Sequence, residues 1–255
     1  MTVAAGTEAD VVREADRLLA LTQGAGVEVR LLGGLGIADT CPSARTHAGL
    51  RRTYGDIDFV APPEHRGALT DLLEQCGYDG DVEFNGLHGG GGRLLFFDTA
   101  RERQIDVFLG VFRMCHTIDL RGRLLPGYRA VALADLVLTK LQIVELNEKD
   151  ARDVLAVFLD HDVLDGEAPD AIDTGRLTDV CRRDWGLYTT ITDNAAKLDD
   201  VASSCLEPDE RALVGERVRR VLDVLETTPK SLKWKTRSRV GRRVAWYELP
   251  EEVDV

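Results

Sequence analysis

The sequence lacks the features that mark membrane-spanning and disulfide-stapled proteins. No stretch approaches the roughly 18 uninterrupted apolar residues of a membrane span. The chain starts with acids where a signal peptide would be basic. Its five cysteines are far apart and never form a Cys-x-x-Cys, so neither a disulfide framework nor a zinc site is indicated. We therefore expect a cytoplasmic protein with no membrane partner and with mostly buried thiols.

The chain also lacks the positive charge of a protein that coats nucleic acid. Its 255 residues carry a net charge of −12, and 44% of them are hydrophobic, which is ordinary for one large globular domain or two modest ones. Positive charge is densest at 230–247, where seven basic residues and no acid lie between Lys230 and Arg243. Aromatic side chains alternate with these cations. Such an arm suits RNA phosphates and unstacked bases, or equally well pairs with the acidic remainder of the chain.

Hydrophobic periodicity separates a first half that mixes helices and strands from a second half that is mainly helical. In the first half it predicts helices at 8–23, with Thr7 as N-cap, just after Gly33-Gly34 and at 63–75, and strands at 27–32, 56–60, 82–84, 93–98 and 104–109. In the second half it predicts helices at 133–144, 154–158, 177–198 and 208–225, with a linker at 165–170. The predicted fold class is α+β: a mixed sheet with flanking helices at 1–128, then a helical region with a basic tail at 129–255.

Three acids carry the chemistry that the sequence suggests. Asp56 and Asp58 are two residues apart on a predicted strand, so their side chains point to one face while Ile57 points to the core. Asp106 lies among apolar residues on a later strand that could bring it alongside this pair. Without a cation the repulsion of three carboxylates would raise at least one pKa, so the set makes chemical sense as an oxygen-rich site for one or two Mg²⁺ ions.

A glycine turn supplies the complementary part of the pattern. Gly33 and Gly34 follow a predicted strand and precede a short helix, where backbone amides can approach phosphate oxygens. Taken alone, each piece has an ordinary reading: Asp-x-Asp is most often a solvated strand or turn, and Gly-Gly after a strand is most often only a turn. The order strand, Gly-Gly, helix, Asp-Ile-Asp strand, then Ile-Asp-Val strand is what favours a nucleotide site.

That order resembles the polymerase-β-like nucleotidyltransferases, whose signature is a Gly-Ser or Gly-Gly turn, an acidic pair and a third strand-borne acid. Leu32-Gly33-Gly34, Asp56-Ile57-Asp58 and Asp106 match this signature over a region of roughly 31–158. The narrower likeness is to nucleotidyltransferase toxins of abortive-infection systems, in which a helical Lys-Leu is followed by a Lys-Asp or Arg-Asp and another Asp. The resemblance implies a nucleotidyltransferase core in the first half of the chain.

The resemblance also implies roles for residues outside the sheet. Lys140 of Lys140-Leu141 would contact the nucleotide phosphates, and Asp150 and Asp153 of the following helix would support the active site. Asp150 could instead be a helix N-cap. The segment between the turn and Asp56 is longer than in compact members, and this added loop is expected to bring Arg52 near the mouth of the nucleotide site. Gly34 departs from the family where many members carry a phosphate-contacting Ser.

The leading expectation is a Mg²⁺-dependent enzyme of the EC 2.7.7 type that transfers NMP from an NTP such as ATP to an acceptor hydroxyl. The acceptor stays open among a tRNA 3′ end, a small molecule such as an aminoglycoside, and a protein. One alternative is a non-catalytic nucleotide-binding regulator. Another is an NAD-binding oxidoreductase, because Gly34-x-Gly36 follows a strand and Asp56 lies about 20 residues on. Asp39 at the third glycine position argues against the oxidoreductase.

Overall fold

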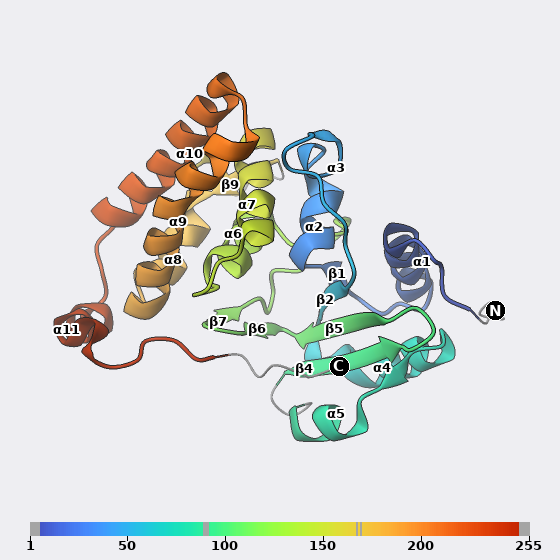
Figure 1. The fold of residues 1–255 in the computed structure, drawn as a ribbon. Helices are drawn as coiled ribbons and strands as arrows, with labels where there is room; N and C mark the ends of the chain where they lie inside the picture. The colour runs from blue at the N-terminus through green and yellow to red at the C-terminus, as the bar shows by residue number, and fades with distance from the viewer. Residues whose placement is uncertain (1–5, 89–91, 167, 169, 250–255) are drawn as a thin grey trace. The chain divides into compact units, whose positions relative to one another are not determined.

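The protein is seen in a computed structural model that describes residues 6–88, 92–166, 168 and 170–249 (Figure 1). Its chain forms two compact units. The first comprises residues 1–39, 53–112 and 119–131, and the second comprises residues 40–52, 113–118 and 132–255. The second unit thus includes residues 40–52 and 113–118 as well as the helical half of the chain. The predicted domain boundary between residues 128 and 129 stays a prediction.

A five-stranded mixed sheet in the order β1-β2-β5-β4-β3 is the centre of the first unit. Its strands are β1 (Arg30–Leu31), β2 (Ile57–Ala61), β3 (Asp79–Gly80), β4 (Arg93–Asp98) and β5 (Arg103–Leu109). β2 and β5 run parallel, and every other neighbouring pair is antiparallel. The helices of this part of the chain are α1 (Val11–Gly24), α2 (Gly33–Thr40), η1 (Pro63–His65), α4 (Arg66–Gln75) and α5 (Val82–His88). The predicted mixed sheet with flanking helices is confirmed.

Alternation along the strands gives the sheet one apolar face. Leu18 of α1 and Leu69 of α4 pack against that face in a single buried cluster. The strand residues of the cluster include Ile57, Phe59, Ala61, Leu94, Phe96, Ile105, Val107 and Leu109. Because successive side chains of a strand point to opposite faces, Asp58 and Asp106 lie on the other face of the sheet. The hydrophobic core therefore decides which side of the sheet carries the acids.

The second unit is helical, as predicted. It contains α3 (Ser43–Thr46), α6 (Leu133–Leu141), α7 (Glu148–Asp160), α8 (Thr174–Cys181), α9 (Trp185–Cys205), α10 (Pro208–Thr227), α11 (Leu232–Val240) and η2 (Gly241–Arg243). Short strands pair as β6 (Val111–Arg113) with β7 (Thr117–Asp119) and as β8 (Asp162–Leu164) with β9 (Ala171–Asp173). The buried face of α10 repeats at helical spacing, through Val214, Val218, Val221 and Leu225. That stripe packs α10 against α7 and α9.

Several predicted elements of the first unit need correction. α1 begins at Val11 with Asp10 as its N-cap, because the Asp10 carboxylate accepts the Arg13 amide, whereas Thr7 hydrogen-bonds Asp98. The strand predicted at 27–32 is only the two residues of β1. The strand predicted at 82–84 is helix α5, which begins where the Asp81 carboxylate accepts the Phe84 amide. The glycine run at 89–92, expected before the β4 strand, lies for the most part outside the described residues.

The second unit brings two further corrections. The single helix predicted at 177–198 is two helices, because the Asp184 side chain accepts the Leu187 amide and starts α9 anew. The linker predicted at 165–170 joins β8 to β9, whose parallel pairing was not predicted, and residues 167 and 169 of it lie outside the described residues. Helix 208–225 is confirmed as α10. Within the described residues, no helix combines the length and apolar character needed to cross a membrane.

Candidate active site

The sheet brings two of the predicted acids together. Asp58 and Asp106 are direct register partners on the parallel strands β2 and β5, so their side chains lie side by side on the face opposite the core. Asp56 stands one residue before β2 and is exposed, Asp58 is half-buried, and Asp106 is only 6% exposed. The predicted convergence of Asp58 and Asp106 on neighbouring strands is thus present in the fold.

Asp106 has partners that the sequence analysis missed. Arg93 of β4 lies with its Nε 2.7 Å and its Nη2 2.6 Å from Oδ1 of Asp106, and Gln104 donates to Oδ2 at 2.7 Å. Arg93 comes from the strand that follows the glycine run, and the antiparallel pairing of β4 with β5 places it beside the acid. The unbroken apolar run Leu94-Leu95-Phe96-Phe97 that follows Arg93 does not alternate, so no pattern in the sequence signalled that Arg93 shares a face with Asp106.

The three acids supply the right donors for Mg²⁺, since carboxylate oxygens are its preferred protein ligands. Across the part of the chain that the structure describes, however, no group of three or more Asp, Glu, His or Cys side chains is gathered closely enough to hold a metal ion. The buried acid of the set, Asp106, is instead neutralised by Arg93. Metal binding by Asp56, Asp58 and Asp106 therefore stays a prediction, with Asp106 already engaged by an internal cation.

The glycine turn packs directly against the acidic pair. Gly33 has φ +58°, in the left-handed region that favours glycine, and begins α2. A Cβ placed on Gly33 would lie 1.9 Å from Oδ2 of Asp58. Gly34 follows in the first turn of α2 and is buried. The structure thus brings the predicted phosphate turn and Asp58 into contact, at the N-terminal end of a helix where backbone amides favour anions.

Replacing Gly33 by Ala is expected to destabilise the first unit by about 2 kcal/mol, because a Cβ raises the cost of the positive φ and collides with Asp58. Thermal or urea unfolding followed by circular dichroism measures this change. The matched control is Gly67→Ala on α4, where a Cβ meets nothing within 4 Å. We expect that control to be neutral or slightly stabilising, and equal stability of the two variants would contradict the role of Gly33.

A second cluster of predicted residues forms in the second unit. Nζ of Lys140 on α6 lies 2.6 Å from Asp150 and 3.0 Å from Asp153, both on α7. Arg52 donates to both oxygens of Asp153, at 2.9 and 2.7 Å. The helix N-cap is Asn147, whose side chain accepts the Asp150 amide, so the alternative reading of Asp150 as the cap was wrong. Asp150 and Asp153 share one face of α7, as their spacing predicted.

This cluster joins two cations and two carboxylates. Burial lowers the pKa of Lys140, but the neighbouring charges of Asp153 and Asp150 outweigh it, and the pKa is raised above its ordinary value. The amine therefore stays protonated at neutral pH. Lys140, Asp150, Asp153 and Arg52 are brought together within the second unit, while Gly33, Gly34, Asp56, Asp58 and Asp106 belong to the first.

The basic and aromatic arm at 230–247 is bound within its own unit. Arg237 donates to the carbonyls of Gly241, Val244 and Ala245 and lies 4.8 Å from the ring centre of Trp185. Other cations of the arm are likewise engaged, Lys230 by the carbonyls of Leu225, Glu226 and Thr228 and Arg242 by the carboxylate of Asp193. Arg242 thus pairs with an acid, while Lys230 and Arg237 contact backbone carbonyls, so both predicted roles of the arm stay predictions and an RNA acceptor gains no support.

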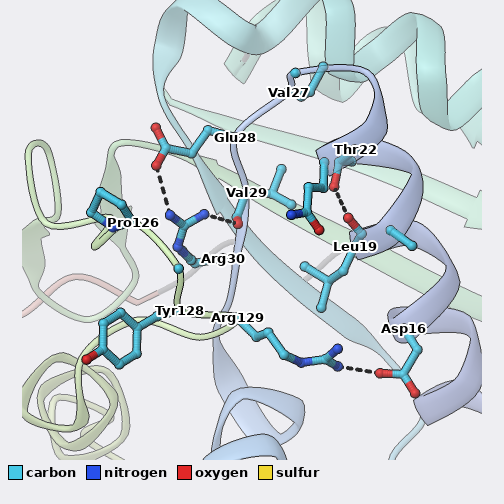
Figure 2. Close-up of a pocket in the computed structure, with 14 residues that line it drawn as sticks. Asp16, Leu19, Thr22, Val27, Glu28, Val29, Arg30, Pro126, Tyr128 and Arg129 are labelled. Carbon is cyan, nitrogen blue, oxygen red and sulfur yellow. Dashed lines mark hydrogen bonds and ion pairs between the residues drawn. The ribbon is translucent and has the colours of Figure 1, made fainter. Parts of the chain in front are cut away.

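A cavity of about 480 Å³ lies in the first unit, away from the carboxylate set. Figure 2 shows it between α1, the stretch before β1 and residues 126–129. Its charged side chains satisfy one another: Arg129 pairs with Asp16 and Asp39, and Arg30 pairs with Glu28. None of the predicted site residues lines this cavity. We therefore do not place the chemistry there.

The dinucleotide-binding alternative is not compatible with the strand directions. That motif needs its first strand to run parallel to the next strand of the βαβ unit. Here β1 pairs antiparallel with β2. Asp39, at the position of the third glycine, is held in an ion pair with Arg129. The spacing of Gly34, Gly36 and Asp56 therefore does not indicate an NAD site.

No family model and no curated protein matches the chain. Among solved structures, it is similar to the lincosamide antibiotic adenylyltransferase LnuA bound to lincomycin, with 17% identity, a TM-score of 0.42, and coverage of 56% of this chain and 94% of that chain. It is also similar to ANT(2″)-Ia in complex with adenylyl-2″-tobramycin, with 15% identity, a TM-score of 0.40, and coverage of 57% and 86%.

A solution structure of the antibiotic-resistance factor ANT(2″)-Ia is similar over a longer span, 85% of this chain and 95% of that chain, with 15% identity and a TM-score of 0.35. The first of these similar structures is thus an antibiotic adenylyltransferase, and the other two are of one antibiotic-resistance factor. The narrower resemblance to abortive-infection toxins stays a prediction.

Proposed function

We propose that this chain is a nucleotidyltransferase that transfers NMP from an NTP to an acceptor hydroxyl and releases pyrophosphate. The observation that carries the proposal is the meeting of three predicted parts in the first unit. Asp58 and Asp106 stand side by side on one face of the sheet, Asp56 precedes them, and the Gly33 turn contacts Asp58. A phosphate-binding turn next to paired carboxylates is the arrangement that phosphoryl transfer needs.

Each part has a role that follows from its chemistry. The backbone amides at Gly33 and Gly34 would bind the triphosphate, since no side chain blocks the approach and the α2 N-terminus favours negative charge. Asp56 and Asp58 would hold Mg²⁺, with Asp106 as a third ligand. When bound, the metal supplies charge neutralisation for the triphosphate and a lowered pKa for the attacking hydroxyl. The chain's own carboxylates orient that hydroxyl against the phosphate.

The second unit carries its own candidate anion-binding cluster, to which the sequence resemblance gives a role at nucleotide phosphates. We assign that role to Lys140, with Asp150 and Asp153 positioning its amine and Arg52 adding positive charge. In the structure that amine is shared by two carboxylates. A phosphate contact therefore requires Lys140 to exchange one carboxylate for a phosphate oxygen. Their proximity in one buried network supports a common role.

For the acceptor, we favour a small polycationic molecule with free hydroxyl groups. The net charge of −12 attracts cations over a distance and disfavours RNA. Moreover, Lys230, Arg237 and Arg242 of the basic arm already contact carbonyl or carboxylate groups of their own unit. If the acceptor is instead an RNA 3′ end or a protein hydroxyl, the same test labels RNA or protein.

The test is label transfer by the purified full chain. Each α-³²P-labelled NTP is incubated in turn with Mg²⁺ and with tobramycin, lincomycin, total tRNA or no acceptor; the two antibiotics are those in the similar structures. We expect an EDTA-sensitive labelled small molecule on thin-layer chromatography. A labelled tRNA band would move the acceptor to RNA, and a labelled protein band to a protein hydroxyl. In parallel, calorimetry with Mg²⁺-ATP, Mg²⁺-CTP and NAD measures nucleotide binding. Nucleotide binding without label transfer indicates an inactive nucleotide-binding regulator. The absence of any nucleotide binding overturns the proposal.

A further inference from the structure

The three tryptophans of the chain, Trp185, Trp234 and Trp246, all line one cavity of the second unit. Its volume is about 360 Å³, which is within the range of small-molecule sites. It lies where the first turn of α9, helix α11 and residues 245–248 meet, and residues 115–117 complete its wall. None of the residues assigned above to nucleotidyl transfer lines it. The cavity is therefore a separate feature of the second unit.

The end of the basic arm is held by the rest of the second unit. The backbone N–H of Glu248 donates to the carbonyl of Cys115 at 3.0 Å, and the indole Nε1 of Trp246 donates to Oγ1 of Thr190 at 3.3 Å. Gly186 in α9 allows a close approach, since a Cβ at this position would lie 2.5 Å from the carbonyl oxygen of Trp246. This wall of the cavity is thus formed before any ligand enters, and that lowers the ordering cost of binding.

Aromatic rings at the cavity are partly exposed rather than packed into the core. Trp185, Trp234, Trp246 and Tyr247 are each half-buried. The rings of Trp185 and Trp246 meet edge to face with their centres 6.2 Å apart, and those of Trp246 and Tyr247 do so at 5.3 Å. Such rings offer a large apolar surface that loses little conformational entropy on binding. They favour a ligand that contains a planar ring.

The indole N–H of Trp234 adds a hydrogen-bonding requirement at this wall. Its Nε1 is buried and has no acceptor among the described residues. A buried donor without an acceptor costs about 1–3 kcal/mol, and a buried Trp N–H usually finds a partner. This donor favours a ligand that carries acceptor oxygens over a hydrocarbon.

Positive charge predominates at the cavity although the chain as a whole is acidic. Among the described residues, its wall carries the cations Arg183, Lys233 and Arg237 against the acids Asp184 and Glu248. Burial lowers the pKa of His116, which also lines the cavity, so its imidazole adds no charge at neutral pH. The local charge is thus opposite in sign to the net charge of −12.

Cations of the arm also lie against the rings of the cavity. The guanidinium carbon of Arg237 lies 4.8 Å from the ring centre of Trp185, and that of Arg242 lies 5.3 Å from the ring centre of Trp246. A cationic ligand in contact with these rings would be repelled by the two guanidinium groups, whereas an anionic ligand would be attracted. The charge distribution therefore selects an anion.

We propose that this cavity is a second ligand site, for a small molecule in which a planar aromatic ring carries an anionic group such as a phosphate. The ring packs against the tryptophans and Tyr247. The anionic group lies near Lys233, whose exposed and flexible side chain can reach it. Binding there needs neither a metal nor the acids of the first unit, so the inference is independent of the proposed function.

The test is titration of the full chain with AMP, followed by tryptophan fluorescence. Because all three tryptophans line the cavity, the fluorescence reports on this site. EDTA is present throughout, so no metal–nucleotide complex forms. We expect a saturable change with AMP. Adenosine, which lacks the anion, phenyltrimethylammonium, which joins a ring to a cation, and inorganic phosphate, which lacks the ring, should each bind about tenfold more weakly or less.

Two lysines of α11 provide a matched pair of variants. Lys233→Glu reverses a charge at the wall and should weaken AMP binding about tenfold. Lys235→Glu makes the same change at an exposed lysine outside the wall and should leave the affinity unchanged. Tyr247→Ala removes one ring from the wall and should weaken binding about tenfold. Circular dichroism spectra confirm that each variant is folded.

Several outcomes would overturn the second site. They are an unchanged fluorescence with AMP, equal AMP affinities of folded Lys233→Glu and Lys235→Glu, and binding of phenyltrimethylammonium or adenosine as tight as that of AMP. A short oligoadenylate separates a free small molecule from RNA as the source of the ring and phosphate. If it binds far more tightly than AMP, the cavity belongs to an RNA-binding surface and the small-molecule site is wrong. None of these outcomes changes the expected result of the label-transfer assay.

Discussion

Replacement of Asp58 by Asn should lower nucleotidyl transfer by about three orders of magnitude and leave the fold intact. The amide keeps the shape of the carboxylate but loses the negative charge that a metal–nucleotide complex requires. Asp58 stands at the centre of the site, in register with Asp106 and in contact with Gly33. The measurement is the rate of label transfer from an α-³²P-NTP at saturating Mg²⁺.

Stability separates a chemical effect from a structural one in this variant. Asp58→Asn keeps the size and shape of this half-buried side chain, so the variant should stay folded, with a cooperative thermal transition and a wild-type circular dichroism spectrum. The matched control is Asp71→Asn, at an exposed acid on α4, which should retain full activity. Wild-type activity in a folded Asp58→Asn variant would remove the basis of the proposed mechanism.

Replacement of Lys140 by Met should cost about 3 kcal/mol of folding free energy. Lys140 is 9% exposed and its amine lies between Asp150 and Asp153. Removing the amine leaves the half-buried Asp150 without its cation, while Arg52 still pairs with Asp153. Urea unfolding of the variant measures the loss. Lys149→Met, at an exposed lysine in the first turn of α7, is the control and should change stability little.

The same network predicts how the difference in stability between the wild type and Lys140→Met depends on pH. The pKa of Lys140 is raised in the folded state by Asp153 and Asp150 in spite of its burial. Its contribution to stability is therefore fully present below the ordinary lysine pKa of 10.5 and is lost as pH rises through the raised folded value. Wild type and Lys140→Met should accordingly converge in stability above that range. Parallel curves through strongly alkaline pH would show that the amine titrates no differently in the folded protein.

The sequence allowed the sheet and its acids to be predicted because strand alternation is a local signal. Ile57 and Phe59 point to the core, and this alone places Asp58 on the opposite face. Helix α5 was missed because Val82 and Phe84 suggested a strand, although Asp81 offered an N-cap. In that case the local capping contact overrode the weak strand preference of two side chains.

Other features depend on pairings that no local pattern reports. Arg93 reaches Asp106 only through the register of β4 with β5, and the Lys140 network forms only when α6 packs on α7 and the segment of Arg52 joins them. The parallel pair β8 and β9 is likewise formed by two three-residue strands. A sequence reading finds the residues of such sites more readily than their partners, because the partners are chosen by packing.

The parallel pairing of β2 with β5 also bears on how the site comes into being as the chain folds. β4 and β5 are joined by a tight connection and can pair early, whereas β2 joins β5 only after the intervening α4, β3, α5 and β4 have been traversed. Non-local pairings of this kind form slowly, since a long loop must first be closed. Asp58 and Asp106 therefore become neighbours late in folding, and partly folded chains lack the pair of carboxylates on which the proposed function rests.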